Sequence, residues 1–488
     1  MQEKLFEKIS VIFSYNSEKN VAIPYKIRWQ LRDYFIKKLG YHHKVREGRE
    51  LFHIFHVTDG NLDFKLRFNT ENLSWILEEI SMDSPINKAA PTIMHIDLNS
   101  CFATIEQQAH PHLRGKPLVI AAYPTPGGCI LAPSIEAKKM GIKTGMKVRE
   151  AQIICPNVIV RSPDPVLVRD VHKQFMKICG DYSPDITPKS IDEVVINFSQ
   201  APELKKGLKS IGIEIKKRFR EEIGEWISCN VGISTNRFLA KLAASLHKPD
   251  GLDIIDYQNL KNVYSTLKLT DLNGINVRFE ARLNQVGIYN PLEFLKTDDI
   301  FLRKQVFKGI TGHYWFLRLR GWEVDDFENK RKSYGQDYAL AKKTDNIEEL
   351  KKIIMKLCEK MGRRLRASNN CAFGMHLGLV YNDWIFWHKG HKFMEPSYTT
   401  QELFSKIMIL FFQQPNKKIV SKIAVSCFEL KPVFDIPPSL FETNIEKKRK
   451  ISLALDKVND RYGEYVIFPA LMMDMKNTIL DRIAFGKI

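Results

Sequence analysis

Hydrophobic positions in the first 90 residues follow more than one spacing. Between residues 23 and 39, Ile27, Leu31 and Phe35 recur at four-residue intervals, which is the spacing of one helix face. Residues 51–57 and 62–68 are apolar runs on either side of Asp59-Gly60, a dipeptide that favours a hairpin. With a closing helix at 72–80, this region is predicted to be a small α+β unit, followed by a Pro-bearing linker.

From residue 92 onwards, short apolar strands alternate with helical stretches. We expect strands at 92–96, 194–198 and 228–233 and helices at 166–179 and 208–219, an alternation typical of an α/β core. Residues 245–325 are helical and basic. The pattern of residues 332–430 is strand, helix, strand, strand, helix, strand, with strands at 334–340, 372–381, 384–393 and 419–430. This last stretch predicts an independent α+β domain.

Three acidic residues stand at the ends of two of these strands. Asp97 follows the strand at 92–96, while Asp192 and Glu193 precede the strand at 194–198. If the two strands are antiparallel neighbours, the three side chains converge. Clustered carboxylates repel one another unless a cation intervenes, and oxygen ligands suit Mg²⁺. Two such ions can clamp the oxygens of a phosphoryl displacement. Acids that merely cap loops are the alternative.

Composition adds charge to this picture. The 488 residues carry a formal net charge of +18, which favours a polyanion such as nucleic acid, although solvated lysines give the same surplus. The eight cysteines include no CxxC pair, so neither a zinc site nor a redox pair is indicated. The N-terminus lacks an apolar signal core, and no apolar run approaches about 18 residues. We therefore expect a cytoplasmic protein, associated with DNA and not with membranes.

The residues around the three carboxylates resemble the signature motifs of the Y-family DNA polymerases, closest to the DNA polymerase IV branch. The motifs are Asp97-Leu98-Asn99-Ser100-Cys101-Phe102-Ala103, residues 134–141, Ser190-Ile191-Asp192-Glu193, and residues 231–241 and 248–251. The resemblance covers about 92–430 and leaves residues 1–90 unassigned. It implies an α/β and α+β multidomain, right-hand polymerase. Its parts would be a palm (91–106 and 164–244), short fingers (107–163), a helical thumb (245–325), a linker and little finger (326–432) and a tail (433–488).

The same resemblance implies a DNA-directed DNA polymerase that adds dNTPs to a primer by two-metal phosphoryl transfer, with low-fidelity translesion synthesis. Asp97, Asp192 and Glu193 would hold two Mg²⁺ ions, with Mn²⁺ as an alternative, and the Leu98 carbonyl would ligate the nucleotide-bound ion. Asn99 stands where many relatives have a second aspartate, a position that is not a metal ligand in the family.

The resemblance also assigns nucleotide-binding roles. Phe102 aligns with the steric gate against a 2′-hydroxyl, with ordinary core packing as the alternative. Lys138 and Arg237 align with phosphate-binding residues, and the backbone N–H groups of Ser100, Cys101 and Phe102 would help. Position 135 is Ile where many members have Tyr, and Lys138 replaces Arg, so weaker dNTP binding is expected. Cys129, Ile130 and Leu131 would roof the nascent base pair.

Two segments are candidates for contacts with larger partners. Residues 272–277 resemble a helix-hairpin-helix, in which Gly274 and Asn276 would present backbone N–H groups to a DNA phosphate. Asn276 replaces the usual glycine, and an ordinary helix–helix turn is the alternative. Ser439, Leu440 and Phe441 vaguely resemble a sliding-clamp peptide without its leading glutamine. Otherwise we expect a monomer that binds primer-template DNA and dNTP.

Two other functions compete with this interpretation. A non-catalytic, polymerase-like scaffold that binds DNA is favoured by the departures at 135, 138 and 276, but all three carboxylates are retained. A nucleotidyl cyclase on a similar sheet would need neither the thumb-like segment nor the positive charge.

Overall fold

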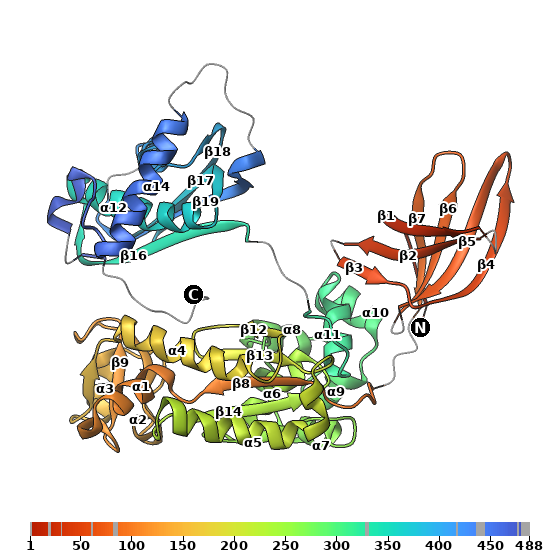
Figure 1. Cartoon of the computed structure of the whole chain (residues 1–488), viewed down its shortest axis with the longest axis horizontal. Coiled ribbons are helices and arrows are strands. Elements are labelled where there is room, and N and C mark those ends of the chain that lie inside the picture. The colour runs from red at the N-terminus through yellow and green to blue at the C-terminus, as the bar shows by residue number, and fades with distance from the viewer. Residues whose placement is uncertain are drawn as a thin grey trace. The chain divides into compact units, whose positions relative to one another are not determined.

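The computed structural model describes residues 2–17, 21–30, 32–59, 62–81, 86–326, 331–415, 418–435, 445–475 and 478–479 (Figure 1). The chain divides into two compact units, which among the described residues are 2–326 and 331–479. Among the described residues, no helix is long and apolar enough to cross a membrane.

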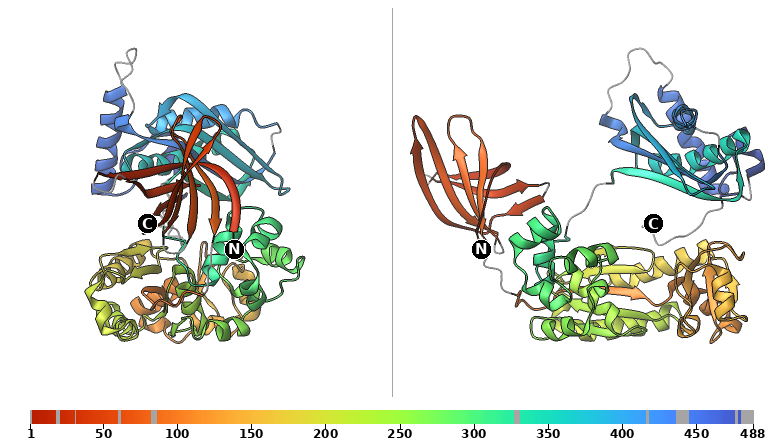
Figure 2. Two further views of the ribbon diagram at one scale, coloured as in Figure 1. Left: turned by 90° about the vertical axis from the view of Figure 1, so that its right-hand side faces the viewer. Right: turned by 180° about the vertical axis from the view of Figure 1, so that it is seen from behind.

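The described residues between 2 and 81 form one antiparallel sheet of seven strands, here called the N-terminal sheet (Figure 2). Its strand order is β3-β2-β1-β7-β6-β5-β4. The strands are β1 (Gln2–Asn16), β2 (Val21–Trp29), β3 (Arg32–Phe35), β4 (Lys38–Glu47), β5 (Glu50–Thr58), β6 (Asp63–Asn69) and β7 (Trp75–Ser81). The strands predicted at 51–57 and 62–68 are confirmed and pair with each other. The helices predicted at 23–39 and 72–80 are wrong, and so is the α+β assignment.

The spacing of the hydrophobic residues explains this correction. An interval of four is also an even number, so it satisfies the alternation of a strand as well as the period of a helix. Tyr25, Ile27 and Trp29 are aromatic or β-branched at every second position, which favours β2. Trp75 and Leu77 are buried because β7 pairs with both β1 and β6, and no local signal reports that pairing.

The N-terminal sheet curls until its two edges meet at one corner. The two-residue connection between the edge strands β3 and β4 is hydrogen-bonded to strands on both sides of the sheet. The Ile36 N–H donates to the Tyr25 carbonyl of β2 and the Lys37 N–H donates to the Thr58 carbonyl at the end of β5, both at 2.9 Å. The inner face therefore encloses an apolar core, which includes Ile27, Trp29, Phe55, Phe64 and Leu77.

A second sheet, the central sheet, has the strand order β12-β13-β8-β14-β15. Its strands are β8 (Ile93–Leu98), β12 (Ile186–Pro188), β13 (Glu193–Asn197), β14 (Cys229–Ser234) and β15 (Leu252–Ile254). The helices α1 (Cys101–Ala109), α4 (Pro165–Gly180) and α5 (Leu208–Arg218) bury one of its faces in a shared apolar core, and α6 (Arg237–Leu246) packs on the other. The predicted α/β alternation is confirmed, including the antiparallel pairing of β8 with β13.

A small sheet of order β10-β9-β11 follows α1 in the chain. It consists of β9 (Leu118–Ala121), β10 (Ile130–Pro133) and β11 (Ile159–Arg161), with α2 (Ile135–Lys139) and α3 (Val148–Ile154) beside it. This sheet has its own small core, which includes Val119, Ile130, Ile142 and Val148.

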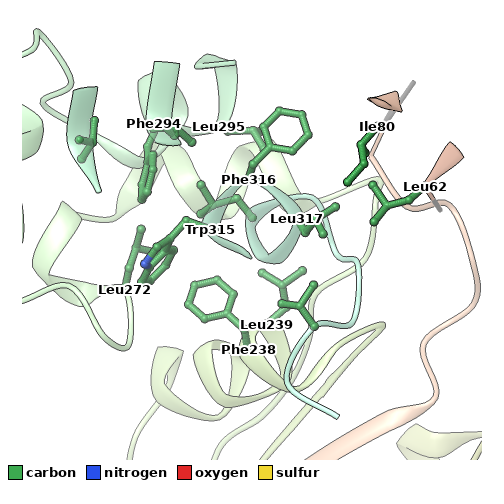
Figure 3. Packing of buried hydrophobic residues seen from close by; sticks show 14 of the residues in the cluster. Leu62, Ile80, Phe238, Leu239, Leu272, Phe294, Leu295, Trp315, Phe316 and Leu317 are labelled. Atoms are coloured by element: carbon green, nitrogen blue, oxygen red, sulfur yellow. The ribbon is translucent and has the colours of Figure 1, made fainter. Parts of the chain in front are cut away.

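The predicted helical stretch after residue 245 is confirmed. It contains α7 (Leu260–Thr266), α8 (Val277–Asn284), α9 (Pro291–Lys296), α10 (Asp299–Phe301) and α11 (Thr311–Leu319). Its core includes Leu272, Phe294 and Trp315 and is continuous with that of the N-terminal sheet. Figure 3 shows the meeting point, where Leu62 and Ile80 approach Leu317. The guanidinium of Arg32 lies 4.3 Å from the ring centre of Tyr314 at the same junction.

The second unit is the α+β domain that the sequence predicts. Its sheet order is β16-β19-β17-β18. The elements are β16 (Ser333–Thr344), α12 (Ile347–Ala367), β17 (Asn370–Tyr381), β18 (Phe386–Ser397), α13 (Thr400–Phe411), β19 (Val420–Pro432) and α14 (Ile445–Tyr462). Arg366 anchors α14 to α12 through a two-pronged ion pair with Asp456. The segment Ser439-Leu440-Phe441 lies outside the described residues.

Candidate active site

The three carboxylates converge at one end of the central sheet. Asp97 on β8 and Glu193 on β13 are directly opposed in the antiparallel register. Asp192 precedes Glu193, and its backbone carbonyl accepts a hydrogen bond from the Leu98 N–H at 2.9 Å. Directly opposed residues in a sheet have neighbouring side chains. The register therefore brings together acidic groups that are 95 positions or more apart in the sequence.

These carboxylates line a cavity of about 750 Å³. The residues that line it are Asp97, Leu98, Asn99, Ser100, Cys101, Leu131, Ala132, Pro133, Ile135, Lys138, Lys139, Thr144, Lys189, Ser190, Asp192, Glu193, Lys248 and Pro249. Most of the side chains predicted to bind metal or nucleotide are thus on one wall or another of a single cavity. Its size suits a ligand larger than an ion.

Burial sets the protonation behaviour of the acidic groups. Burial raises the pKa of Asp192 to about 6, and the negative charges of Asp97 and Glu193 also raise this pKa. The Ser190 hydroxyl acts in the opposite direction, because it donates a hydrogen bond to Asp192 Oδ1 at 2.6 Å. Burial also raises the pKa of Asp97, against the lowering effect of Lys248. His95, buried beneath Glu193, is neutral because burial lowers its pKa to about 3. Positive charge at this site therefore comes from lysines.

Two lysines that sequence reasoning left without a role bind the carboxylates. Lys248 donates to Asp97, and Lys241 of α6 donates to both oxygens of Glu193 at 2.7 and 2.9 Å. Both lysines lie in segments that resemble family motifs, 231–241 and 248–251, but only the fold brings them next to the acidic residues. Within the described ranges, no group of three or more His, Cys, Asp or Glu is arranged as a ready metal cage. The donors are nonetheless hard oxygens already balanced by cations, which is the chemistry that fits Mg²⁺.

The start of α1 forms another wall of the cavity. Ser100 precedes the helix in the left-handed conformation, with φ of 47°, an arrangement that functional sites often retain. The first turn of α1 contains no acidic residue, so its N-terminal N–H groups favour an anion. The Asn99 side chain is occupied by other hydrogen bonds: its amide nitrogen donates to Ser228 Oγ at 3.0 Å, and its amide oxygen accepts from Asn230.

Four predicted nucleotide-site side chains do not line the cavity, namely those of Phe102, Cys129, Ile130 and Arg237. Phe102 is fully buried in the core beneath the central sheet. Ile130 is fully buried in the small core because side chains alternate along β10, which leaves Leu131 on the cavity face. Cys129 precedes β10, and its thiol donates to the Gly145 carbonyl at 3.7 Å. Arg237 is buried and paired with Glu323 at 3.1 Å and Asp326 at 2.6 Å. Without a ligand, the Arg237 and Ile130 side chains thus have other partners, and their contact with the nucleotide stays a prediction.

The predicted hairpin lies between two helical turns. Gly274 adopts a φ of +103°, and a side chain there would meet the ring of Trp315 at 3.3 Å. Asn276 caps α8, with its side-chain oxygen accepting from the N–H groups of Arg278 and Phe279. The Asn276 side chain is thus occupied locally, and only its backbone would be available to DNA.

Comparisons with known proteins find relatives that match most of this chain. A sequence profile of the impB/mucB/samB family matches residues 96–245, and the C-terminal domain of that family matches residues 331–435. DNA polymerase IV of Pelotomaculum thermopropionicum is 31% identical over 396 residues, which cover 80% of this chain and 97% of that protein. DNA polymerase IV of Moorella thermoacetica is 30% identical over 391 residues, 78% of this chain and 96% of that protein.

Solved structures resemble the fold. The Y-family DNA polymerase chimera Dbh-Dpo4-Dbh aligns with a TM-score of 0.60 at 23% identity, covering 70% of this chain and 99% of that one. An insertion ternary complex of Dbh DNA polymerase aligns with a TM-score of 0.51 at 22% identity, with the same coverage.

Proposed function

Because the chain belongs to the impB/mucB/samB family and is a template-directed, translesion DNA polymerase, we propose that Asp97, Asp192 and Glu193 are its catalytic carboxylates. The observation that carries this proposal is the register that sets Asp97 opposite Glu193, with Asp192 beside them on one cavity. Y-family polymerases are generally dependent on divalent metals. We assign two ions, Mg²⁺ or Mn²⁺, to these carboxylates and one of them also to the Leu98 carbonyl.

When bound, such ions activate the primer 3′-hydroxyl and neutralise charge on the phosphates. The chain's own residues bind and orient the triphosphate of the dNTP. Lys138 and Lys248 supply ammonium groups on the cavity wall, and Ser100, Cys101 and Phe102 supply backbone N–H groups at the start of α1. Ile135 lines the same cavity without a hydroxyl to offer, so more of the binding energy falls on the lysines.

The fold is a right hand with palm, fingers, thumb and little finger, and we propose the following boundaries. The palm is 91–106 with 164–244, the fingers are 107–163, the thumb is 245–325, and the little finger follows a linker within 326–432. Leu131 of β10 lines the cavity and, with Cys129 and Ile130 beside it in the chain, would roof the nascent base pair. Gly274 and Asn276 would offer backbone N–H groups to a DNA phosphate. Primer-template DNA and dNTP are then the partners of a monomer, with a sliding clamp as a candidate for residues 439–441.

Phe102 is proposed as the steric gate, and its burial makes a paired experiment necessary. Phe102→Ala is compared with Ile105→Ala, which empties the same core one helical turn later. A gate predicts that only Phe102→Ala raises the rate of rNTP relative to dNTP insertion. An equal ratio in the two variants, with equal losses of stability, assigns Phe102 to the core alone.

Primer extension tests the catalytic proposal directly. The protein, Mg²⁺ and each dNTP are combined with an undamaged template and with one that carries a minor-groove guanine adduct. Templated addition that requires metal and disappears in Asp192→Ala/Glu193→Ala supports the assignment, and the adduct template reports bypass. Tight primer-template binding without addition by the intact protein would instead favour the non-catalytic scaffold. Synthesis of a cyclic nucleotide from a free triphosphate would favour the cyclase.

A further inference from the structure

The inner face of the N-terminal sheet continues beyond its core as a cluster of aromatic rings. Phe55 and Trp75 are buried and form the floor. Phe13 and Phe68 pack on Trp75, with ring centres 5.9 and 4.7 Å away, and His42 stacks on Phe55 at 4.4 Å. Phe13 is 47% exposed, and Phe68 and His42 are partly exposed. Flat apolar rings are thus presented to solvent at this end of the sheet.

The histidines of this cluster behave as neutral rings. Burial lowers the pKa of both His42 and His53, and the charge of Lys44 lowers it further. Their nitrogens are 3.1 Å apart, and His53 lies edge-on to Phe68 at 6.4 Å. At neutral pH they extend the aromatic surface without adding charge.

Two cations flank these rings on the same face. In the register of β4 with β5, His42 opposes Phe55, Lys44 opposes His53 and Arg46 opposes Leu51, so alternate residues of β4 point to the inner face. Lys44 and Arg46 are exposed, and neither has an ion-pair partner in the described part of the chain.

Two acids near β4 lie on the opposite, outer face, where Lys65 and Arg67 share Glu78 and Arg67 also binds Glu47. On the inner face Glu7 opposes Leu77, and its carboxylate accepts a hydrogen bond from Trp29 Nε1 at 2.5 Å. The exposed rings are therefore flanked by Lys44 and Arg46 on β4, whereas the inner-face acid Glu7 lies on β1 and is bonded to Trp29.

We propose that this surface, formed by Phe13, His42, Lys44, Arg46, His53 and Phe68, binds single-stranded DNA. Unpaired bases expose π-faces that stack on aromatic rings, while Lys44 and Arg46 bind the phosphates between them. A duplex hides its base faces and would leave the rings unused. The uncompensated positive charge selects a polyanion over an ordinary protein segment. The inference goes beyond the catalytic site and does not depend on which residues bind metal.

Binding of fluorescent oligo(dT) to the full chain tests the proposal. We expect Phe13→Ser to weaken binding by at least about 5-fold, because stacking of one base is lost. Lys44→Gln/Arg46→Gln should weaken binding and flatten its salt dependence, by about 0.7 in the logarithmic slope for each lost phosphate contact. The matched controls are on the outer face: Tyr41→Ser removes an aromatic ring that is 61% exposed, and Lys65→Gln removes one positive charge.

Photocrosslinking with iodouracil-substituted oligonucleotide locates the contact. Crosslinks to peptides that contain Phe13 or Phe68, together with weaker binding in the inner-face variants and unchanged binding in the controls, support the proposal. Parental affinity in Lys44→Gln/Arg46→Gln, with crosslinks only beyond residue 91, would overturn it, whatever the folding of Phe13→Ser. Loss of binding in the outer-face controls to the same degree would also overturn it. Primer extension on a short template is expected to be unchanged in all these variants, which separates this outcome from a failure of the catalytic proposal.

Discussion

Gly232 is the point at which α6 rests on the central sheet, and replacing it with alanine should move that helix. A Cβ at this position would lie 2.0 Å from the Ala240 carbonyl oxygen and 2.3 Å from the Ala244 amide nitrogen. Both atoms belong to the helix backbone, so no side-chain rotation relieves the overlap. Ordinary contact begins near 3.4 Å, so α6 would have to retreat by about 1.4 Å (3.4 minus 2.0).

The size of the effect follows from what α6 buries. Leu239, Leu242 and Ala243 are at most 2% exposed, and a retreat opens gaps around all of them. Overpacking a well-packed core costs about 1–3 kcal/mol, and contact with unyielding backbone places this substitution at about 3 kcal/mol. For a unit of about 330 residues, an unfolding entropy of about 2.1 cal/mol/K per residue makes this a fall in Tm of about 4 °C. Because α6 also carries Lys241, the partner of Glu193, the rate of primer extension should fall as well.

Thermal unfolding followed by circular dichroism measures the effect. The matched control is Gly309→Ala, because a Cβ there meets nothing within 4 Å and the backbone is outside the left-handed region. The control should stay within about 0.5 kcal/mol of the parent. If Gly232→Ala melted within about 2 °C of the parent and kept the parental rate, the close packing of α6 on β14 would be refuted.

Three further predictions concern other parts of the molecule. Asp192→Asn should slow single-turnover primer extension about a thousand-fold, which is the order of loss when one charge-stabilising group is removed. The control is Asp185→Asn, which changes an exposed acid outside the cavity and should leave the rate unchanged. Equal rates in the two variants would remove Asp192 from the catalytic set. Leu317→Ala should lower the free energy of unfolding in urea by about 2–5 kcal/mol, because Leu317 is 5% exposed at the junction with the N-terminal sheet; an unchanged midpoint would contradict that packing. Burial lowers the pKa of Lys356 from 10.5 to about 8, so between pH 8 and 10.5 the unfolded chain binds more protons than the folded chain and stability rises with pH. The variant Lys356→Met should lack this rise. If its curve of stability against pH ran parallel to that of the parent, the lowered pKa of Lys356 would be refuted.

Elements whose pattern admits one interpretation were predictable from the sequence. The helix expected at 166–179 is α4, because its apolar positions lie on one face and Asp164 caps it ahead of Pro165. The strand expected at 92–96 is β8, a short apolar run too brief for a helix. The helix predicted at 23–39 was wrong because an interval of four residues fits both the period of a helix and the alternation of a strand. The pairing that decides between them, β1 with β2, depends on residues outside that window.

The site was predictable in its acids and less so in its other side chains. A motif identifies residues, but it does not show which way a side chain points or which other residues bind that side chain. Ile130 and Leu131 are adjacent, yet the alternation of β10 sends one to the small core and the other to the cavity. Arg237 stands in a phosphate-binding motif, but Glu323 and Asp326, more than 80 positions later, hold its guanidinium. Such competition is set by tertiary structure alone.

If the proposed site is correct, the lysines on the carboxylates would allow this cavity to accept both metal ions and a triphosphate. Without a ligand, Lys248 and Lys241 balance Asp97 and Glu193, while Asp192 relies on Ser190 and has a pKa raised to about 6. An entering triphosphate competes for the same ammonium groups, since it carries more negative charge than a carboxylate. Each lysine that turns towards phosphate leaves a carboxylate unbalanced in a buried place, which raises the affinity of that carboxylate for another cation. Binding of the nucleotide and binding of divalent ions are therefore expected to reinforce each other, with the lysines as the exchangeable partner.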